Sequence, residues 1–268
     1  MSVSGESTLT VAAKPAGCPR TASPSIVADT IVPSASPQRV YSSPMENLWF
    51  WLLAIAGVIL TGISKSGFAG GPGVLAVPLI SLAMPVGQAA AMILPVLLVM
   101  DTRTVYLYRK HVNLRLLRIM LPGAIAGIAL GGILLGELSE RHLQLALGLL
   151  CFVFAAWGAL TPLLARLPGA AFVWSGIAGT TSTLIQAGGP PMNVYLLSLN
   201  MPKLLWLGTA GVFFAVVNLA KLIPYTLLGH WNREVLLAAL VLAPISFIGV
   251  NLGHKLQHHR RRHRANSR

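Results

Sequence analysis

The sequence predicts an all-α, polytopic membrane protein of about eight or nine transmembrane helices, built as two inverted repeats that contain Gly/Pro-broken helices. The 268 residues are 54% hydrophobic and only 10% charged, whereas soluble domains carry about 25% charged residues. Several uncharged runs reach the roughly 20 residues that one spanning helix needs. The phrase Ala-Gly-Gly-Pro also occurs twice, at 69–72 and at 187–190, each time before an apolar run that ends in Met-Pro.

Residues 1–44 differ from the rest of the chain, because they are rich in Ser and Pro and contain no long apolar run. Segments of low hydrophobicity cannot bury enough apolar surface to fold, so we interpret 1–44 as a disordered N-terminal extension. Met45 stands directly before the first apolar run. The sequence therefore leaves two translation starts open, at Met1 and at Met45.

The first repeat is expected at 45–136 and contains four apolar segments, of which the second is broken. Between Gly67 and Pro78, this second segment carries several glycines and two prolines, which interrupt a helix. The four expected spans are 48–64, 66–84, 86–108 and 119–136.

A connecting transmembrane helix is expected at 137–166, with its apolar core at 143–165. The next run, 167–202, is uncharged for 36 residues. As one helix it would be about 54 Å long, whereas the bilayer core is about 30 Å thick, so it must fold back near 188–191. Spans at 204–228 and 235–253 complete the second repeat, 167–256, and a basic cytoplasmic tail follows at 257–268.

Matching residues recur in the two halves at a nearly constant spacing of 117 to 119 positions, which indicates an internal repeat of four spans. One further span lies between the two units, and an odd spacer inverts the second unit relative to the first. Chance matches in apolar sequence are the alternative. The matched pairs are the two Ala-Gly-Gly-Pro phrases, Met84 with Met201, Asp101 with Asn218, His111 with His230, and Asn113 with Asn232.

The net charge of +13 is concentrated beside the apolar spans, in the loop at 103–118 and in the C-terminal tail. Basic loops of this kind are typical of the cytoplasmic side of a membrane protein and can contact anionic lipids. We therefore expect the lipid bilayer, and no nucleic acid, as the partner of these charges. The loop at 229–233 carries one basic residue, Arg233, and is expected outside, with the C-terminus in the cytoplasm.

Each Gly-Gly-Pro phrase is expected to break a helix within the membrane and to free backbone N–H groups at the start of a half-helix. Helix N-termini attract anions, and interrupted helices at matching positions of two inverted halves are typical of secondary transporters. Close helix packing by small residues and hydrogen bonds of Ser and Thr within their own helices are the alternatives. The candidate substrate-binding residues are Lys65, Gly70, Gly71, Thr181, Ser182, Gln186, Gly188, Gly189 and Asn193.

Three ionisable residues within the apolar spans, Asp101, Arg103 and Lys221, are candidates for a coupling or counter-ion role. An intramembrane ion is a functional hypothesis by default. For Asp101 we favour an ion pair with a nearby arginine at the membrane interface. Lys65 and Lys221 could instead snorkel, placing their ammonium groups at the membrane surface.

Three segments carry a family resemblance: GISKSGFAGGPGVLAVPLISLAMP, YLYRKHVNLRLLRIMLPGAIAGIALG and TSTLIQAGGPPMNVYLL. They resemble the sulfite exporter TauE/SafE family of membrane transporters, and the resemblance extends over about residues 48–256. It implies an anion exporter of the bacterial inner membrane, whose cargo is sulfite, a sulfonate or another small organic anion.

The sequence thus predicts a secondary exporter of a small anion that works by alternating access. An anion channel is the first alternative. A membrane-embedded enzyme is less favoured, because Asp101 is the single carboxylate well inside an apolar stretch. No nucleotide-binding motif occurs, and the seven His lie in loops or in the tail, so neither a cofactor nor a metal site is expected. Assembly into a homo-oligomer stays open.

Overall fold

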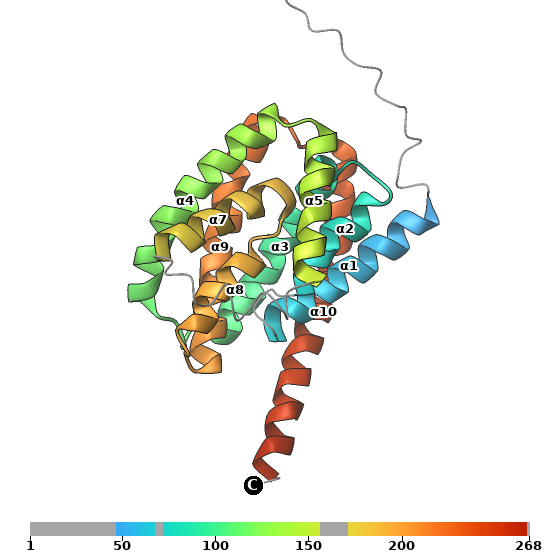
Figure 1. Ribbon diagram of the computed structural model, residues 1–268. Helices are drawn as coiled ribbons and strands as arrows, with labels where there is room; N and C mark the ends of the chain where they lie inside the picture. The colour runs from blue at the N-terminus through green and yellow to red at the C-terminus, as the bar shows by residue number, and fades with distance from the viewer. Residues whose placement is uncertain (1–46, 68–71, 156–170, 267–268) are drawn as a thin grey trace, which may run out of the picture. The chain divides into compact units, whose positions relative to one another are not determined.

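Helices account for the regular structure of the described residues, which form nine α-helices and one short 3-10 helix without any strand (Figure 1). The computed structural model describes residues 47–67, 72–155 and 171–266. By its contacts the chain divides into Met1–Tyr41 and Ser42–Arg268, and all described residues belong to the second unit. The helices are α1 (Leu48–Gly67), η2 (Pro72–Leu75), α2 (Ala76–Ser81), α3 (Val86–Tyr108), α4 (Leu114–Glu137), α5 (Glu140–Ala155), α7 (Ala171–Ile185), α8 (Gly189–Ser198), α9 (Lys203–Leu227) and α10 (Arg233–Asn266).

Five of these helices, α1, α3, α4, α9 and α10, are long and apolar enough to cross a membrane. Helix α3 coincides with the expected span 86–108, and α9 lies within one residue of the expected 204–228. Helix α7 is apolar but shorter, at 15 residues. The all-helical class is therefore confirmed, whereas the total of eight or nine spans stays a prediction.

The second Gly-Gly-Pro phrase separates two short helices. Helix α7 ends at Ile185 and α8 begins at Gly189, with Pro190 and Pro191 in the first turn of α8. Proline is tolerated there because the first N–H groups of a helix have no intrahelical acceptor. The helix break expected near 188–191 is thus confirmed. Its counterpart at 68–71 lies outside the described residues, and the chain resumes beyond it with η2 and the six-residue α2.

Side-chain caps fix where several helices begin. The side-chain oxygen of Asn113 accepts a hydrogen bond from Leu116 N at 3.0 Å at the start of α4. Asn232 does the same for Val235 N at 2.7 Å at the start of α10. Such a cap stabilises a helix by about 1 kcal/mol. These two asparagines are the pair that the sequence places 119 positions apart.

Helix α5 is tied to the start of α3 by a carboxylate. Glu140 accepts hydrogen bonds from Val86 N at 2.5 Å and from Gly87 N at 3.4 Å. Negative charge is stabilising at a helix N-terminus, where free N–H groups carry partial positive charge. Pro85 precedes this end as its N-cap and offers no side-chain acceptor, so Glu140 replaces the missing cap.

Two helix pairs, α4 with α7 and α1 with α10, pack at backbone distance through glycines. A side chain at Gly127 of α4 would collide with the carbonyl oxygen of Gly176, and one at Gly249 of α10 would lie 2.8 Å from the carbonyl oxygen of Ile59. In lipid, close van der Waals contact of this kind replaces the hydrophobic effect as the force that holds helices together. The two contacted carbonyls, at positions 59 and 176, are 117 residues apart.

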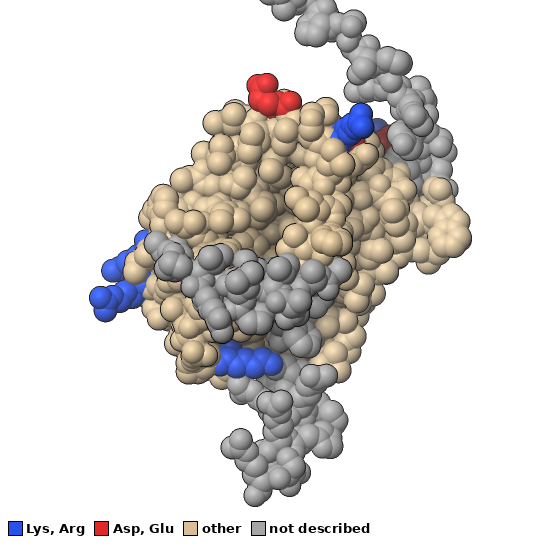
Figure 2. All heavy atoms as spheres, viewed as in Figure 1, with Lys and Arg blue, Asp and Glu red and all other residues tan. Residues whose placement is uncertain are grey.

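Helices α3 and α9 form the centre of the bundle. More than half of the most apolar stretch of each is buried, against less than half for α1, α4 and α10. The outer helices leave large apolar side chains exposed, such as Leu130 and Ile133 on α4 and Leu240 on α10. On the face shown in Figure 2 the described surface is mostly uncharged, with the charged residues near its edges. This distribution suits a bundle surrounded by lipid.

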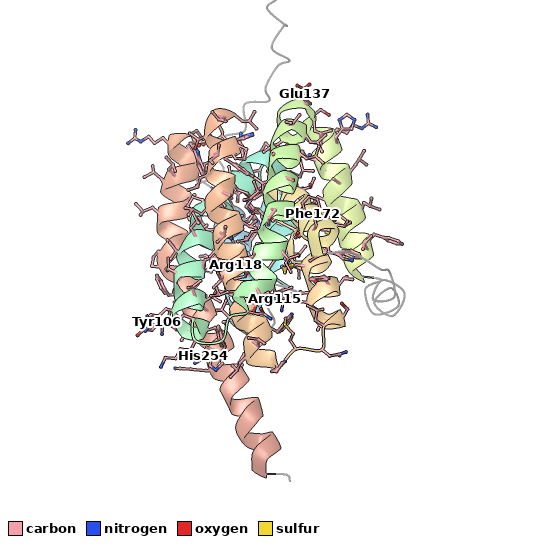
Figure 3. The ribbon with its side chains drawn as sticks, turned by 90° about the vertical axis from the view of Figure 1, so that its left-hand side faces the viewer. Tyr106, Arg115, Arg118, Glu137, Phe172 and His254 are labelled. Carbon is pink, nitrogen blue, oxygen red and sulfur yellow. The ribbon has the colours of Figure 1, made fainter. Side chains whose placement is uncertain are left out.

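The loops that follow α3 and α9 lie at opposite ends of α4. The carbonyl oxygen of His111, in the loop before α4, lies against Gly208 near the start of α9. At the other end of α4, Gly136 faces the side chain of Leu228, directly after α9. Figure 3 shows the same separation, with Tyr106 and His254 toward one end of the bundle and Glu137 at the other.

Replacing Gly127 by Leu should separate α4 from α7. We expect the free energy of unfolding to fall by about 1–3 kcal/mol, because overpacking forces the backbones apart. The matched control is Gly148→Leu on α5, where nothing lies within 4 Å of the added carbon. Thermal unfolding of both purified variants in detergent measures the difference. Equal midpoints for both variants and the parent protein would show that this contact contributes no stability.

Candidate functional site

A cavity of about 40 Å³ lies where α1, α3, α7, α8 and α9 meet. One water molecule needs about 10–15 Å³, so the cavity has room for a small ligand or a few waters. Polar and apolar side chains both contribute to its wall. In the described part of the chain, its lining is formed by Thr61, Lys65, Val74, Leu97, Ser182, Gln186, Gly188, Gly189, Phe214 and Asn218.

On one side of the cavity, a lysine and a carboxylate are paired inside the bundle. The ammonium group of Lys65 forms an ion pair with Asp101 and donates a hydrogen bond to Leu97 O at 3.2 Å. Asp101 also accepts a hydrogen bond from the side-chain amide of Asn218 at 2.6 Å. All three polar residues are buried. Lys65 therefore points into the protein and does not snorkel to the surface.

The expected ion pair between Asp101 and an arginine is wrong. Arg103 lies only two positions further along α3, but its side chain donates a hydrogen bond to Asn251 of α10 at 3.3 Å. Its guanidinium also lies 5.7 Å from the ring centroid of Tyr106. Residues two apart on a helix point in different directions, so Arg103 and Asp101 serve different neighbours.

Lys221 of α9 is 0% exposed, and its ammonium group contacts only neutral oxygens among the polar partners found in the described residues. It donates to the hydroxyl of Ser182 at 2.9 Å, to the carbonyl oxygen of Ser182 at 3.3 Å and to the side-chain oxygen of Gln186. Snorkelling is thus wrong for Lys221 as well. The site combines two buried lysine side chains with one buried aspartate.

Gln186 sits at the break between α7 and α8 in a strained backbone conformation. Its φ is 57°, a region that non-glycine residues rarely adopt. The side chain reaches α3, donating to Ala90 O at 2.9 Å, and its oxygen accepts from Lys221. Strain of this kind persists only where the surroundings fix it, and it gathers at functional sites. The break therefore directs Gln186 between α3 and α9.

The N-terminus of α8 opens onto the same cavity through Gly188 and Gly189. Pro190 and Pro191 have no N–H group, so the two glycines supply the first backbone donors at this end. The helix dipole adds partial positive charge there. Together with Lys65, which lines the cavity, this end gives the cavity a set of donors suited to an anion.

The remaining candidate residues have other surroundings. The hydroxyl of Thr181 donates to Ile177 O at 2.8 Å and to Ala187 O at 3.2 Å, so it holds the end of α7 and does not line the cavity. Asn193 is buried, and its side-chain oxygen has no partner in the described part of the chain. It lies outside the lining. Gly70 and Gly71 fall outside the described residues.

Sequence reasoning did not name all residues of the site. The repeat spacing pairs Asn218 with Asp101, and the two side chains form a hydrogen bond in the structure. This sequence signal could therefore have predicted that Asn218 belongs to the site. Thr61 and Phe214 also line the cavity. Nothing in the sequence separates Phe214 from the apolar residues around it on α9.

Comparison with known proteins adds an independent finding. The family model described as Sulfite exporter TauE/SafE matches residues 53–265, which include the described helices from most of α1 to nearly the end of α10. Neither the curated proteins nor the solved structures give a match. The family is one of membrane transporters of sulfur anions. The match extends over most of the length of the chain, and the chain therefore belongs to the sulfite exporter TauE/SafE family.

Proposed function

We propose that this protein is a secondary transporter that exports a small anion by alternating access, from the cytoplasm of a bacterium across its inner membrane. The observation that carries the proposal is the Lys221 ammonium group, which is fully buried against neutral oxygens beside the cavity. An ionisable residue at membrane depth is a functional hypothesis by default. A bound anion would give Lys221 the countercharge that its protein neighbours do not supply.

The proposed cargo position is the cavity, which Lys65 lines and which Lys221 approaches through Ser182 and Gln186. Lys65, Ser182 and Gln186 line the cavity, and the latter two also accept hydrogen bonds from Lys221. An anion entering the cavity would meet Lys65 directly and could replace Ser182 or Gln186 as a partner of Lys221. An anion adds an opposite charge that these neutral oxygens do not provide, and charge attraction is strong in a buried site, so this exchange would favour binding.

Two inverted repeats are the second part of the proposal, and paired contacts support them. The hydroxyl of Tyr108 donates to Ser66 O at 2.8 Å, and that of Tyr225 donates to Thr183 O at 2.7 Å. The two tyrosines are 117 positions apart, and so are their acceptors. Asp101 and Asn218, also 117 apart, contact each other directly. Contact between equivalent residues is expected where two halves meet at a symmetry axis.

The proposed inversion would fix the membrane topology. The loop after α3 and the loop after α9 lie at opposite ends of α4, as two oppositely oriented units require. The basic loop after α3 would face the cytoplasm, and the C-terminus would lie on the same side. Alternating access would then move one repeat against the other around the fixed site.

An anion channel is the alternative, and flux measurements separate the two. In proteoliposomes, a carrier shows saturation and counterflow, whereas a channel shows neither. Counterflow of labelled sulfite with the purified protein would support the carrier. Flux that rises linearly with concentration and shows no counterflow would favour the channel.

Replacing Lys221 by Met should abolish most transport. Removing one member of a buried charged contact costs about 2–5 kcal/mol, which corresponds to roughly 30-fold or more in binding. Counterflow of sulfite in proteoliposomes measures the effect. The control is Arg118→Gln, an exposed residue of α4. Wild-type counterflow in the Met variant would exclude Lys221 from the site.

Replacing Gly189 by Leu should abolish transport while membrane insertion continues, because the added side chain would fill the cavity at the start of α8. Gly148→Leu is the matched control, since that position of α5 faces open space. Protein in the membrane fraction measures insertion, and efflux from loaded proteoliposomes measures transport. Undiminished efflux in the Gly189 variant would refute this placement of the site.

Reporter fusions test the inversion. A reporter joined after Asn113 should be cytoplasmic, and one joined after Trp231 should be periplasmic, because the two loops lie at opposite ends of the bundle. Alkaline phosphatase and a fluorescent protein that folds only in the cytoplasm give opposite readouts at each position. If both fusions report the same side, the repeats are not inverted.

A further inference from the structure

We infer that the site binds its cargo as a monoanion, an inference that rests on the transport function proposed above. The titratable side chains that line the cavity, or that bond to its lining in the described ranges, are Lys65, Asp101, Lys221 and Tyr225. The Tyr225 hydroxyl donates a hydrogen bond to Thr183 O. It therefore keeps its proton and is counted as neutral. With both lysines taken as protonated, two ammonium groups against one carboxylate leave one positive charge unbalanced.

The excess charge belongs to one half of the protein. In the first half, Lys65 is neutralised by Asp101. At the repeat spacing of 117, Asn218 stands where Asp101 stands in the first half, so the second half has an amide in place of the carboxylate. The polar partners of Lys221 in the described residues, Ser182 and Gln186, are neutral as well. One negative charge on the cargo makes the whole cluster neutral.

The hydrogen bond between the two halves couples the charges into a single site. The Asp101 carboxylate is shared between Lys65 and the amide of Asn218. It is therefore already used by two donors and is not free to turn toward Lys221. The carboxylate cannot neutralise both lysines at once, and the remaining positive charge is available to the ligand.

The charge count discriminates strongly because the site is buried. A dianion would leave one negative charge uncompensated inside the protein, and the effective penalty corresponds to about a hundredfold or more in affinity. The cavity, about 40 Å³, also limits the part of the cargo that it encloses to a small head group. A small monoanionic oxyanion head group, such as a sulfonate or hydrogen sulfite, fits both conditions.

The test compares two anions that differ in charge but hardly in shape. Methanesulfonate and sulfate are both tetrahedral and of similar size, and a methyl group in one replaces a charged oxygen in the other. With the purified full-length protein in proteoliposomes, counterflow of labelled methanesulfonate is measured in the presence of each unlabelled anion as inhibitor. We expect sulfate to inhibit at least about a hundredfold more weakly.

Sulfite supplies a second measurement that needs no variant. It changes from a monoanion to a dianion near neutral pH, whereas methanesulfonate stays a monoanion. Inhibition by sulfite should therefore weaken as the pH rises, relative to inhibition by methanesulfonate at the same pH. A constant ratio of the two inhibitory concentrations across this range would contradict the inference.

Two variants of the paired residues separate net charge from local structure. Asp101→Asn raises the excess to two positive charges, and we expect the preference for methanesulfonate over sulfate to fall by about tenfold or more. The matched control combines Asp101→Asn with Asn218→Asp. This exchange leaves the net charge unchanged. It also retains an amide–carboxylate contact between α3 and α9, with the amide now on α3 and the carboxylate on α9. The preference should therefore remain, even if the transport rate falls.

The outcomes distinguish this inference from the proposed function. Equal inhibition by sulfate and methanesulfonate, or loss of the preference in the exchange variant, would overturn the monoanion inference while the carrier stands. Absence of counterflow with sulfite and methanesulfonate alike would overturn the proposed function, and the inference with it. A preference that follows the net charge through both variants would support the inference.

Discussion

An ammonium group inside a lipid bilayer costs several kcal/mol unless charges or dipoles around it compensate. This cost applies to Lys221, and the residues around Lys221 reduce it. The break after α7 positions Gln186, the last turn of α7 positions Ser182, and both direct oxygens at the ammonium group. These neutral acceptors solvate the charge without cancelling it. Under the proposed function, an anion would add the countercharge that these acceptors lack.

Polar groups can converge here because the helices around them approach closely. Glycines bring α1 against α10 and α4 against α7 at backbone distance, and these outer pairs enclose the more deeply buried α3 and α9. Close packing supplies dispersion contacts that lipid would otherwise match. It also buries Asp101 and Asn218 away from lipid, and a hydrogen bond is stronger in such surroundings than in bulk water. Packing at the periphery and polarity at the centre thus depend on each other.

Much of the helical architecture could be predicted from the sequence, because hydrophobic length and Gly/Pro breaks act locally. The span at 86–108 and the break near 188–191 are examples. Partner choice could not be predicted in the same way. Arg103 is closer to Asp101 in sequence, but the partner is Lys65, which comes from another helix. The strained φ of Gln186 likewise depends on tertiary contacts that no local pattern contains.

The single unbalanced positive charge also has a consequence for energetics. If a monoanion neutralises the site, the loaded protein crosses between its two orientations without moving net charge. The empty protein carries the positive charge back, and a membrane potential that is negative inside favours that return by about 2.3 kcal/mol per 100 mV for a charge that crosses the whole field. Asn218, an amide where the repeat spacing matches the Asp101 carboxylate, would then allow the cell's voltage to drive export without a coupling ion.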